Sequence, residues 1–208
     1  MQKTIAMLVV AMAPLAVSAQ TENFDKVAEG GLPAGWISGV TGKGAPKWVV
    51  VADPSAPSKP NVLKQSGSGT YPWAVKKDVS LADGFVETRF KPVSGRQDQA
   101  GGVVWRWKDG QTYYVARANA NENNVSLYYT TNGVRTTIKY VDAPVASNTW
   151  HTIRAEFAGR KISVFLDGKR YIESDDGHIS QAGAVGVWTK ADSVTAFDDF
   201  TYGEILRK

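Results

Sequence analysis

Short runs of β-branched and aromatic residues recur along the chain, and several of them alternate apolar with polar positions. Residues 85–91 are an example, because Val86, Thr88 and Phe90 share one face of an extended strand while their neighbours share the other. No segment has the 3.6-residue period of an amphipathic helix. The pattern predicts strands at residues 21–28, 47–52, 61–65, 73–79, 85–91, 100–107, 112–119, 125–130, 134–140, 150–157, 161–167, 170–173, 184–189 and 194–202.

Turn residues separate these runs. Asp-Gly at 109–110, Asn-Gly at 132–133 and Asp-Gly at 167–168 each supply the left-handed conformations that tight turns need. Prolines interrupt residues 53–60, which we expect to form a loop. Strands at this spacing, without helical crossovers, favour two antiparallel sheets packed face to face. We therefore expect an all-β fold, a two-sheet antiparallel jelly-roll sandwich, with residues 20–208 as a single domain.

The start of the chain has the pattern of a secretory signal. Lys3 precedes an apolar run over residues 5–17, and the small residues at 17–19 suit cleavage before Gln20. The apolar run is shorter than a membrane span, and no later segment is apolar for long enough. We expect residues 1–19 to be a signal peptide and the mature protein to be exported, periplasmic or secreted, without spanning a membrane.

Composition narrows the chemistry. The chain has no cysteine, which excludes a disulfide framework and a thiolate metal site. Its 24 Lys and Arg against 20 Asp and Glu give a formal net charge of only +4, so we expect no nucleic-acid partner. His151 and His178 are the only imidazoles, too few to favour a transition-metal site. We expect a monomer that requires no cofactor.

Polar and aromatic residues concentrate on the hairpin predicted at residues 100–119. On its first arm, strict alternation would place Trp105 and Trp107 on one face and Arg106 on the other. Flat aromatic rings cover the C–H faces of a pyranose, and Arg, Asn and Lys hydrogen-bond its hydroxyls. The candidate substrate-binding residues are Arg106, Tyr114, Arg117, Asn119, Asn124, Trp188, Lys190 and Asp192.

Several segments resemble known families. Residues 150–154 (Trp-His-Thr-Ile-Arg) and 162–169 (Ile-Ser-Val-Phe-Leu-Asp-Gly-Lys) are similar to a signature of concanavalin A-like and laminin G-like jelly rolls. Residues 100–106, 113–115 and 183–200 more narrowly resemble the 3-keto-disaccharide hydrolase family, formerly a domain of unknown function. That resemblance implies a concave sheet that holds sugar derivatives and, in some members, cleavage of glycosidic bonds after oxidation of the sugar at carbon 3.

The sequence departs from that family at two places. Arg106 matches the family's arginine, but Tyr114 stands where active members have an acid, and residues 185–192 lack the family's glutamine and histidine. Our leading interpretation is therefore an exported carbohydrate-binding domain. One alternative is a hydrolase or lyase acting on 3-keto-glycosides, with Glu87 or Glu122 as general base and Arg106 holding the substrate. A second alternative is a laminin G-like protein-adhesion module.

Carboxylates near the two ends of the domain suggest a structural calcium. Asp25 lies early in the chain, and Asp198 and Asp199 lie near its end. Calcium prefers oxygen ligands, and jelly rolls often tie their first and last strands together with one. The alternative is that one of the paired aspartates faces solvent and the other accepts hydrogen bonds from backbone amides.

Overall fold

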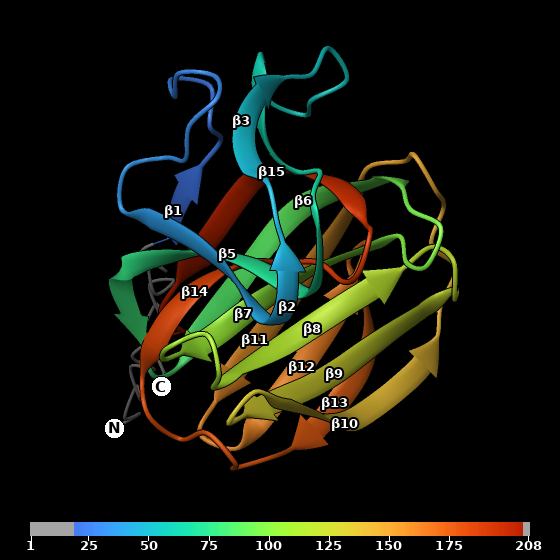
Figure 1. Cartoon of the computed structure of the whole chain (residues 1–208). Coiled ribbons are helices and arrows are strands. Elements are labelled where there is room, and N and C mark those ends of the chain that lie inside the picture. Colours follow the sequence, from blue (N-terminus) through green and yellow to red (C-terminus); the bar gives the residue numbers. More distant parts are fainter. Residues whose placement is uncertain (1–18, 206–208) are drawn as a thin grey trace, which may run out of the picture.

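The two-sheet antiparallel sandwich is confirmed by the computed structural model, which describes residues 19–205 (Figure 1). An eight-stranded sheet has the order β13-β12-β11-β6-β15-β4-β3, with β1 also paired to β15. A seven-stranded sheet has the order β10-β9-β8-β7-β14-β5-β2. The strands are β1 (Ala19–Glu22), β2 (Trp36–Ala45), β3 (Trp48–Ala52), β4 (Asn61–Gln65), β5 (Ser68–Leu81), β6 (Gly84–Ser94), β7 (Ala100–Trp107), β8 (Tyr113–Asn119), β9 (Asn124–Thr131), β10 (Val134–Asp142), β11 (His151–Ala158), β12 (Lys161–Leu166), β13 (Lys169–Asp175), β14 (Gly183–Trp188) and β15 (Val194–Gly203).

The predicted hairpins are present. Trp105 on β7 pairs with Tyr114 on β8, and Val134 on β10 pairs with Thr131 on β9. Asn132 and Gly133 adopt φ values of 51° and 77°, the left-handed turn that the Asn-Gly pair predicts. Residues 1–18, which include most of the expected signal peptide, lie outside the described residues.

Two predictions about the first third of the chain are wrong. β2 was not expected, because glycines at 39, 42 and 44 interrupt any apolar alternation along it. The strand predicted at residues 21–28 ends at Glu22, and a turn follows in which Val27 N–H donates to the carbonyl of Phe24 at 3.0 Å. For β2, pairing with β5 rather than local composition decides the conformation, whereas a local turn ends the first strand.

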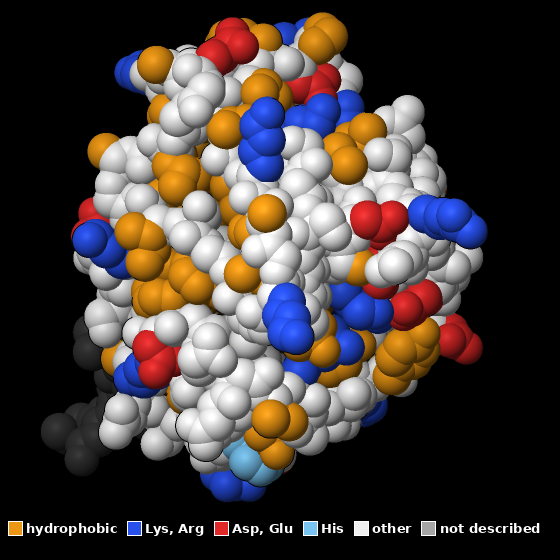
Figure 2. Space-filling model, in the orientation of Figure 1, with side chains coloured by type: hydrophobic (Ala, Val, Ile, Leu, Met, Phe, Trp, Pro, Cys, Tyr) orange, Lys and Arg blue, Asp and Glu red, His pale blue; other side chains and the backbone are white. Residues whose placement is uncertain are grey.

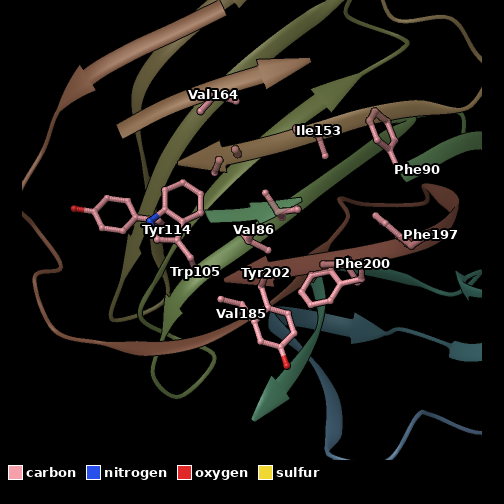
Figure 3. Close-up of a cluster of buried hydrophobic side chains, with 14 of the residues drawn as sticks. Val86, Phe90, Trp105, Tyr114, Ile153, Val164, Val185, Phe197, Phe200 and Tyr202 are labelled. Carbon is pink, nitrogen blue, oxygen red and sulfur yellow. The ribbon is translucent and has the colours of Figure 1, made fainter. Parts of the chain in front are cut away.

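The core lies between the two sheets and is rich in aromatic rings (Figure 3). Trp105 is fully buried and stacks between Tyr114 at 5.3 Å and Phe157 at 5.5 Å, so one indole joins β7, β8 and β11. Val86 and Ile153 fill the same layer from the facing sheet. Burial of such large side chains is the main stabilising contribution to the sandwich.

A bulge at the end of β7 changes which side chains face outward. Arg106 has a φ of +48°, and the pairing of β7 with β14 shifts register at this point. A bulge places consecutive residues out of alternation. Trp105 therefore packs in the core while Trp107 lies in a second apolar cluster, which corrects the expectation that the two indoles share a face.

Within residues 19–205 there is no helix that is long and apolar enough to cross a membrane. The described chain consists of strands and the loops that join them.

Candidate functional site

The outer face of the seven-stranded sheet is curved into a trough. In Figure 1, β8, β9 and β10 cross in front of the other sheet. A Cβ placed on Gly133, in the β9–β10 turn, would lie 3.9 Å from Thr41 Cγ2 on β2. Five strand spacings of about 4.8 Å separate β9 from β2 in the sheet order, so a flat sheet would hold them roughly 24 Å apart. The sheet therefore curls, and the turn covers one end of the trough.

Aromatic side chains line the covered end of the trough. Trp73 and Trp107 meet edge to face at 5.0 Å, and Tyr71 stacks on Trp188 at 5.6 Å. Trp188 is fully buried, while Tyr71 is partly exposed above it. The expected sugar-stacking role of Trp188 is corrected accordingly: Tyr71 presents the accessible ring and Trp188 supports it from below.

Arg135, on the edge strand β10, lies across these rings. Its guanidinium carbon is 4.2 Å from the ring centre of Tyr128 on β9 and 4.5 Å from that of Tyr71 on β5. Such cation–π contacts hold the side chain over the trough. Figure 2 shows hydrophobic and cationic side chains gathered on this face of the molecule.

A network of charged and amide side chains occupies the other end of the trough. Arg117 Nη2 donates to Glu122 at 2.6 Å, and its Nη1 lies 3.5 Å from Asp98. Lys190 Nζ lies 2.9 Å from Asp98, and Asn119 donates to the same carboxylate at 2.7 Å. Arg117, Asn119 and Asp98 are buried, so the network is held rigidly.

The rim of this network is accessible. Glu122 is exposed in the β8–β9 connection, and Asn124 donates to it at 2.7 Å. Asn124 also donates to the hydroxyl of Tyr140, a residue that is half exposed on β10. Burial raises the pKa of Glu122, but hydrogen bonds from Asn124 and the charge of Arg117 outweigh it and hold that pKa below its usual range. Glu122 is therefore ionised at neutral pH and presents a hydrogen-bond acceptor.

Asp192 positions the loop that carries Asp98. Its carboxylate accepts the backbone N–H groups of Arg96 at 2.7 Å, Gln97 at 3.0 Å and Asp98 at 3.1 Å. Although burial raises the pKa of Asp192, these bonds lower it more, and the net shift is downward. The predicted binding residue Asp192 thus holds Asp98 in place rather than facing the trough directly.

A pocket of about 610 Å³ opens beside the charged network. Asp98, Lys190 and Tyr71 form part of its wall, so the acid, the cation and the accessible ring converge on one space. A volume of this size suits a small ligand or a short stretch of an oligomer. The full lining is Lys43, Gly44, Ser68, Gly69, Thr70, Tyr71, Gln97, Asp98, Lys190 and Ala191.

Two candidate residues lie elsewhere. Arg106 is 1% exposed and donates three hydrogen bonds of 2.6–3.0 Å to loop carbonyls at one end of the sandwich. Tyr114 is fully buried in the core, where its hydroxyl donates to Asp176. The expectation that they share a surface with Trp188 is corrected, because Tyr114 faces the inter-sheet layer and the bulge turns Arg106 away from the trough.

The two candidate general bases are not brought together. Glu87 is on β6 of the eight-stranded sheet, where it pairs with Arg154 at 3.4 Å, whereas Glu122 is in the trough of the other sheet. The carboxylate that accompanies Glu122 is Asp98, which contacts the same two cations, Arg117 and Lys190. Any carboxylate chemistry in the trough would involve Asp98 and Glu122.

The proposed calcium ligands each have other partners. Asp25 accepts the N–H of Asn61 at 3.1 Å, and Asp199 lies 3.4 Å from Arg89. Asp198 accepts hydrogen bonds from the Ser58 backbone at 2.9 Å and hydroxyl at 2.8 Å, and burial raises its pKa to about 6. Among residues 19–205, no three His, Asp or Glu side chains are grouped to hold a metal ion. The calcium stays a prediction.

Sequence reasoning missed four residues of the trough. Asp98 could have been found from the predicted hairpin. Residue 100 pairs with Asn119, so the loop just before residue 100, which contains Asp98, lies beside the end of β8. Arg135, Lys43 and Tyr140 had none, because their approach to the site depends on the curvature of the sheet.

Comparison with known proteins identifies the fold. No protein-family model matches the sequence, and no curated protein does. Among solved structures, the carbohydrate binding module CBM66 from Bacillus subtilis superposes with a TM-score of 0.67 at 20% identity, covering 82% of this chain and 96% of that one. The fold is a concanavalin A-like jelly roll. A Bacillus licheniformis β-glucanase superposes with a TM-score of 0.55 at 13% identity, and the match covers 90% of this chain and 98% of that one. A protein of unknown function with a galectin-like fold from Bacillus subtilis superposes with a TM-score of 0.59 at 10% identity, and the match covers 91% of this chain and 100% of that one.

Proposed function

We propose that this concanavalin A-like jelly roll is an exported protein that binds a saccharide in the trough of its seven-stranded sheet. The observation that carries the proposal is the buried network around Arg117, which ends at the pocket beside the accessible ring of Tyr71. A fixed set of charged and amide groups next to one flat ring matches the two surfaces of a sugar, its hydroxyls and its C–H face.

In this proposal each group has a separate role. The partly exposed ring of Tyr71 offers apolar contact at the pocket wall, and Lys190 offers a donor there. Glu122 and Asp98, which are both paired with Arg117 and Lys190, offer carboxylate acceptors, and Tyr140 adds a hydroxyl at the rim. The structural neighbours support the same class of ligand, since they include a carbohydrate binding module and a β-glucanase. Export rests on the signal pattern of residues 1–19.

The test is a glycan array probed with the mature protein, Tyr140→Ala and Lys190→Ala. Loss of one hydrogen bond to a ligand, charge-assisted for Lys190, should weaken binding by about tenfold. Val134→Ala is the matched control, because Val134 is 67% exposed on the same strand as Tyr140. Glycan binding that both trough variants leave unchanged would remove the site, and binding to proteins alone would favour the adhesion module.

The hydrolase alternative is tested on the same samples. The protein is incubated with 3-keto-glycosides and with unoxidised oligosaccharides, and released reducing sugar is measured. The two carboxylates of Glu122 and Asp98, which share their cationic partners in the trough, are the observation that supports this alternative. Turnover that disappears in Glu122→Gln, while the variant still binds glycans, would establish the enzyme. Binding without turnover by the wild type would retire it.

A further inference from the structure

Cations outnumber carboxylates around the trough. Arg117 and Lys190 are both paired with carboxylates, at 2.6 Å and 2.9 Å, so their charges are balanced within the protein. Two further cations have no such partner among residues 19–205: Lys43 on the pocket wall and Arg135 on the ring of Tyr71. The charged groups that line the pocket or join its ion-pair network are Lys43, Arg117 and Lys190 against Asp98 and Glu122.

Arg135 is the clearer of the two unbalanced cations. Within residues 19–205 no carboxylate oxygen lies within 4.0 Å of it, and its contacts are the rings of Tyr71, Tyr128 and Trp188. Its Nη1 is buried and has no hydrogen-bond acceptor in the described part of the chain. A buried guanidinium N–H is costly to leave unpaired, because it has lost water and gained no acceptor in return.

Lys43 lies on the pocket wall beside Tyr71. Two hydrogen bonds join the backbone of Lys43 to Thr70. The Lys43 N–H donates to Thr70 Oγ1 at 3.1 Å, and the Thr70 hydroxyl donates to the Lys43 carbonyl at 3.2 Å. Those two bonds position the residue, while its exposed ammonium forms no ion pair with a residue in the 19–205 range. Tyr71 contacts Arg135 and lines the same pocket as Lys43, so both cations lie close to one residue.

We propose that the saccharide recognised here is acidic, carrying a carboxylate or a sulfate ester. This rests on the proposed function. A sugar seated in the pocket beside Tyr71 brings such a group close to the guanidinium of Arg135, which packs on that ring, and to the ammonium of Lys43 on the pocket wall. Arginine binds planar and tetrahedral oxyanions through paired N–H donors, which a neutral hydroxyl cannot match. The ligand's negative charge would balance the two cations that the protein leaves unbalanced.

The carboxylate and the sulfate are separated by the ligands used. Titration calorimetry compares oligogalacturonate, a sulfated galactan oligosaccharide and a neutral galacto-oligosaccharide of equal length. We expect at least one acidic ligand to bind about tenfold or more tightly than the neutral one, and the tighter of the two identifies the acidic group. Arg135→Gln and Lys43→Gln should each reduce that preference by several-fold to tenfold. Both positions are on strands at or near the surface, and circular dichroism verifies the fold.

Non-specific attraction is the main competing explanation, and Arg89→Gln controls for it. Arg89 is on the eight-stranded sheet, paired with Asp199, and its side chain is 52% exposed. It changes net charge as the test variants do. Equal effects of Arg89→Gln and Arg135→Gln would overturn the inference, as would neutral ligands binding as tightly as acidic ones. In that second case the saccharide site itself would stand, whereas absence of binding to every glycan would instead overturn the proposed function.

Discussion

Replacing Arg106 with methionine should destabilise the protein without affecting the trough. The side chain is 1% exposed and donates to the carbonyls of Ala82 at 3.0 Å, Gly159 at 2.9 Å and Ile179 at 2.6 Å. These carbonyls belong to three different loops, so one guanidinium ties the β5–β6, β11–β12 and β13–β14 connections together. Methionine has a similar length and keeps most of the packing, but it donates no hydrogen bond.

The size of the effect follows from these bonds. A hydrogen bond from a charged donor contributes about 1.5–3 kcal/mol, and desolvation of the buried guanidinium offsets a part of the sum. We therefore expect Arg106→Met to lower the free energy of unfolding by roughly 3–4 kcal/mol, a large fraction of the stability of a typical domain. The +48° φ of Arg106 penalises both side chains alike, so backbone strain cancels in the comparison.

Urea unfolding followed by tryptophan fluorescence measures the loss, and calorimetry at low temperature measures glycan binding by the folded variant. Arg106→Lys is the partner variant: it keeps the charge but loses the planar fork, and we expect about half of the destabilisation. A loss below about 1 kcal/mol, or glycan binding abolished in a folded Arg106→Met protein, would refute the structural role and return Arg106 to the binding site.

Three further predictions concern other positions. Gly102→Ala should cost about 2 kcal/mol or more in unfolding free energy, because its Cβ would lie 2.4 Å from the Ala116 carbonyl oxygen, whereas Gly31→Ala, with nothing within 4 Å, should cost far less. Burial raises the pKa of Asp198 from 3.8 to about 6, so the protonated side chain should contribute stability that is complete below about pH 4 and lost as pH rises through about 6. The loss in unfolding free energy should reach up to about 3 kcal/mol. In Asp198→Asn, the unfolding free energy should lack this dependence on pH. Glu122→Gln should cost below about 1 kcal/mol at neutral pH, since the carboxylate is partly screened, and the difference should vanish as pH falls through the lowered pKa of Glu122; a constant difference would contradict this.

Local patterns anticipated much of the architecture. The Asp-Gly and Asn-Gly pairs mark turns whose residues do adopt left-handed conformations, at Gly110, Asn132 and Gly133. Alternation identified β6 and both arms of the β7–β8 hairpin. Such signals are local, because a turn's φ values and a strand's alternation depend on residues within a few positions of each other.

Part of the trough was also within reach of the sequence. Arg117, Asn119, Asn124 and Lys190 were grouped as candidates, and the structure brings them into one network. Arg117 and Asn119 are two residues apart on one strand, so their shared face follows from strand geometry alone. Arg106 does not belong to this network, because its positive φ forms a bulge that interrupts the alternation of side chains. The neighbouring residues contain no pattern that predicts the bulge.

The amino-acid sequence by itself determined the strands, the turns and the antiparallel sandwich, because apolar alternation and turn chemistry act over short distances. Only the tertiary structure decided that Arg135 on β10 would cover Tyr71 on β5, and that Asp98 would meet Lys190. Those contacts depend on the order of strands in the sheet and on its curvature, which arise from packing summed over the whole core. Where the side chains of distant strands converge is therefore a property of the folded molecule and not of any segment of it.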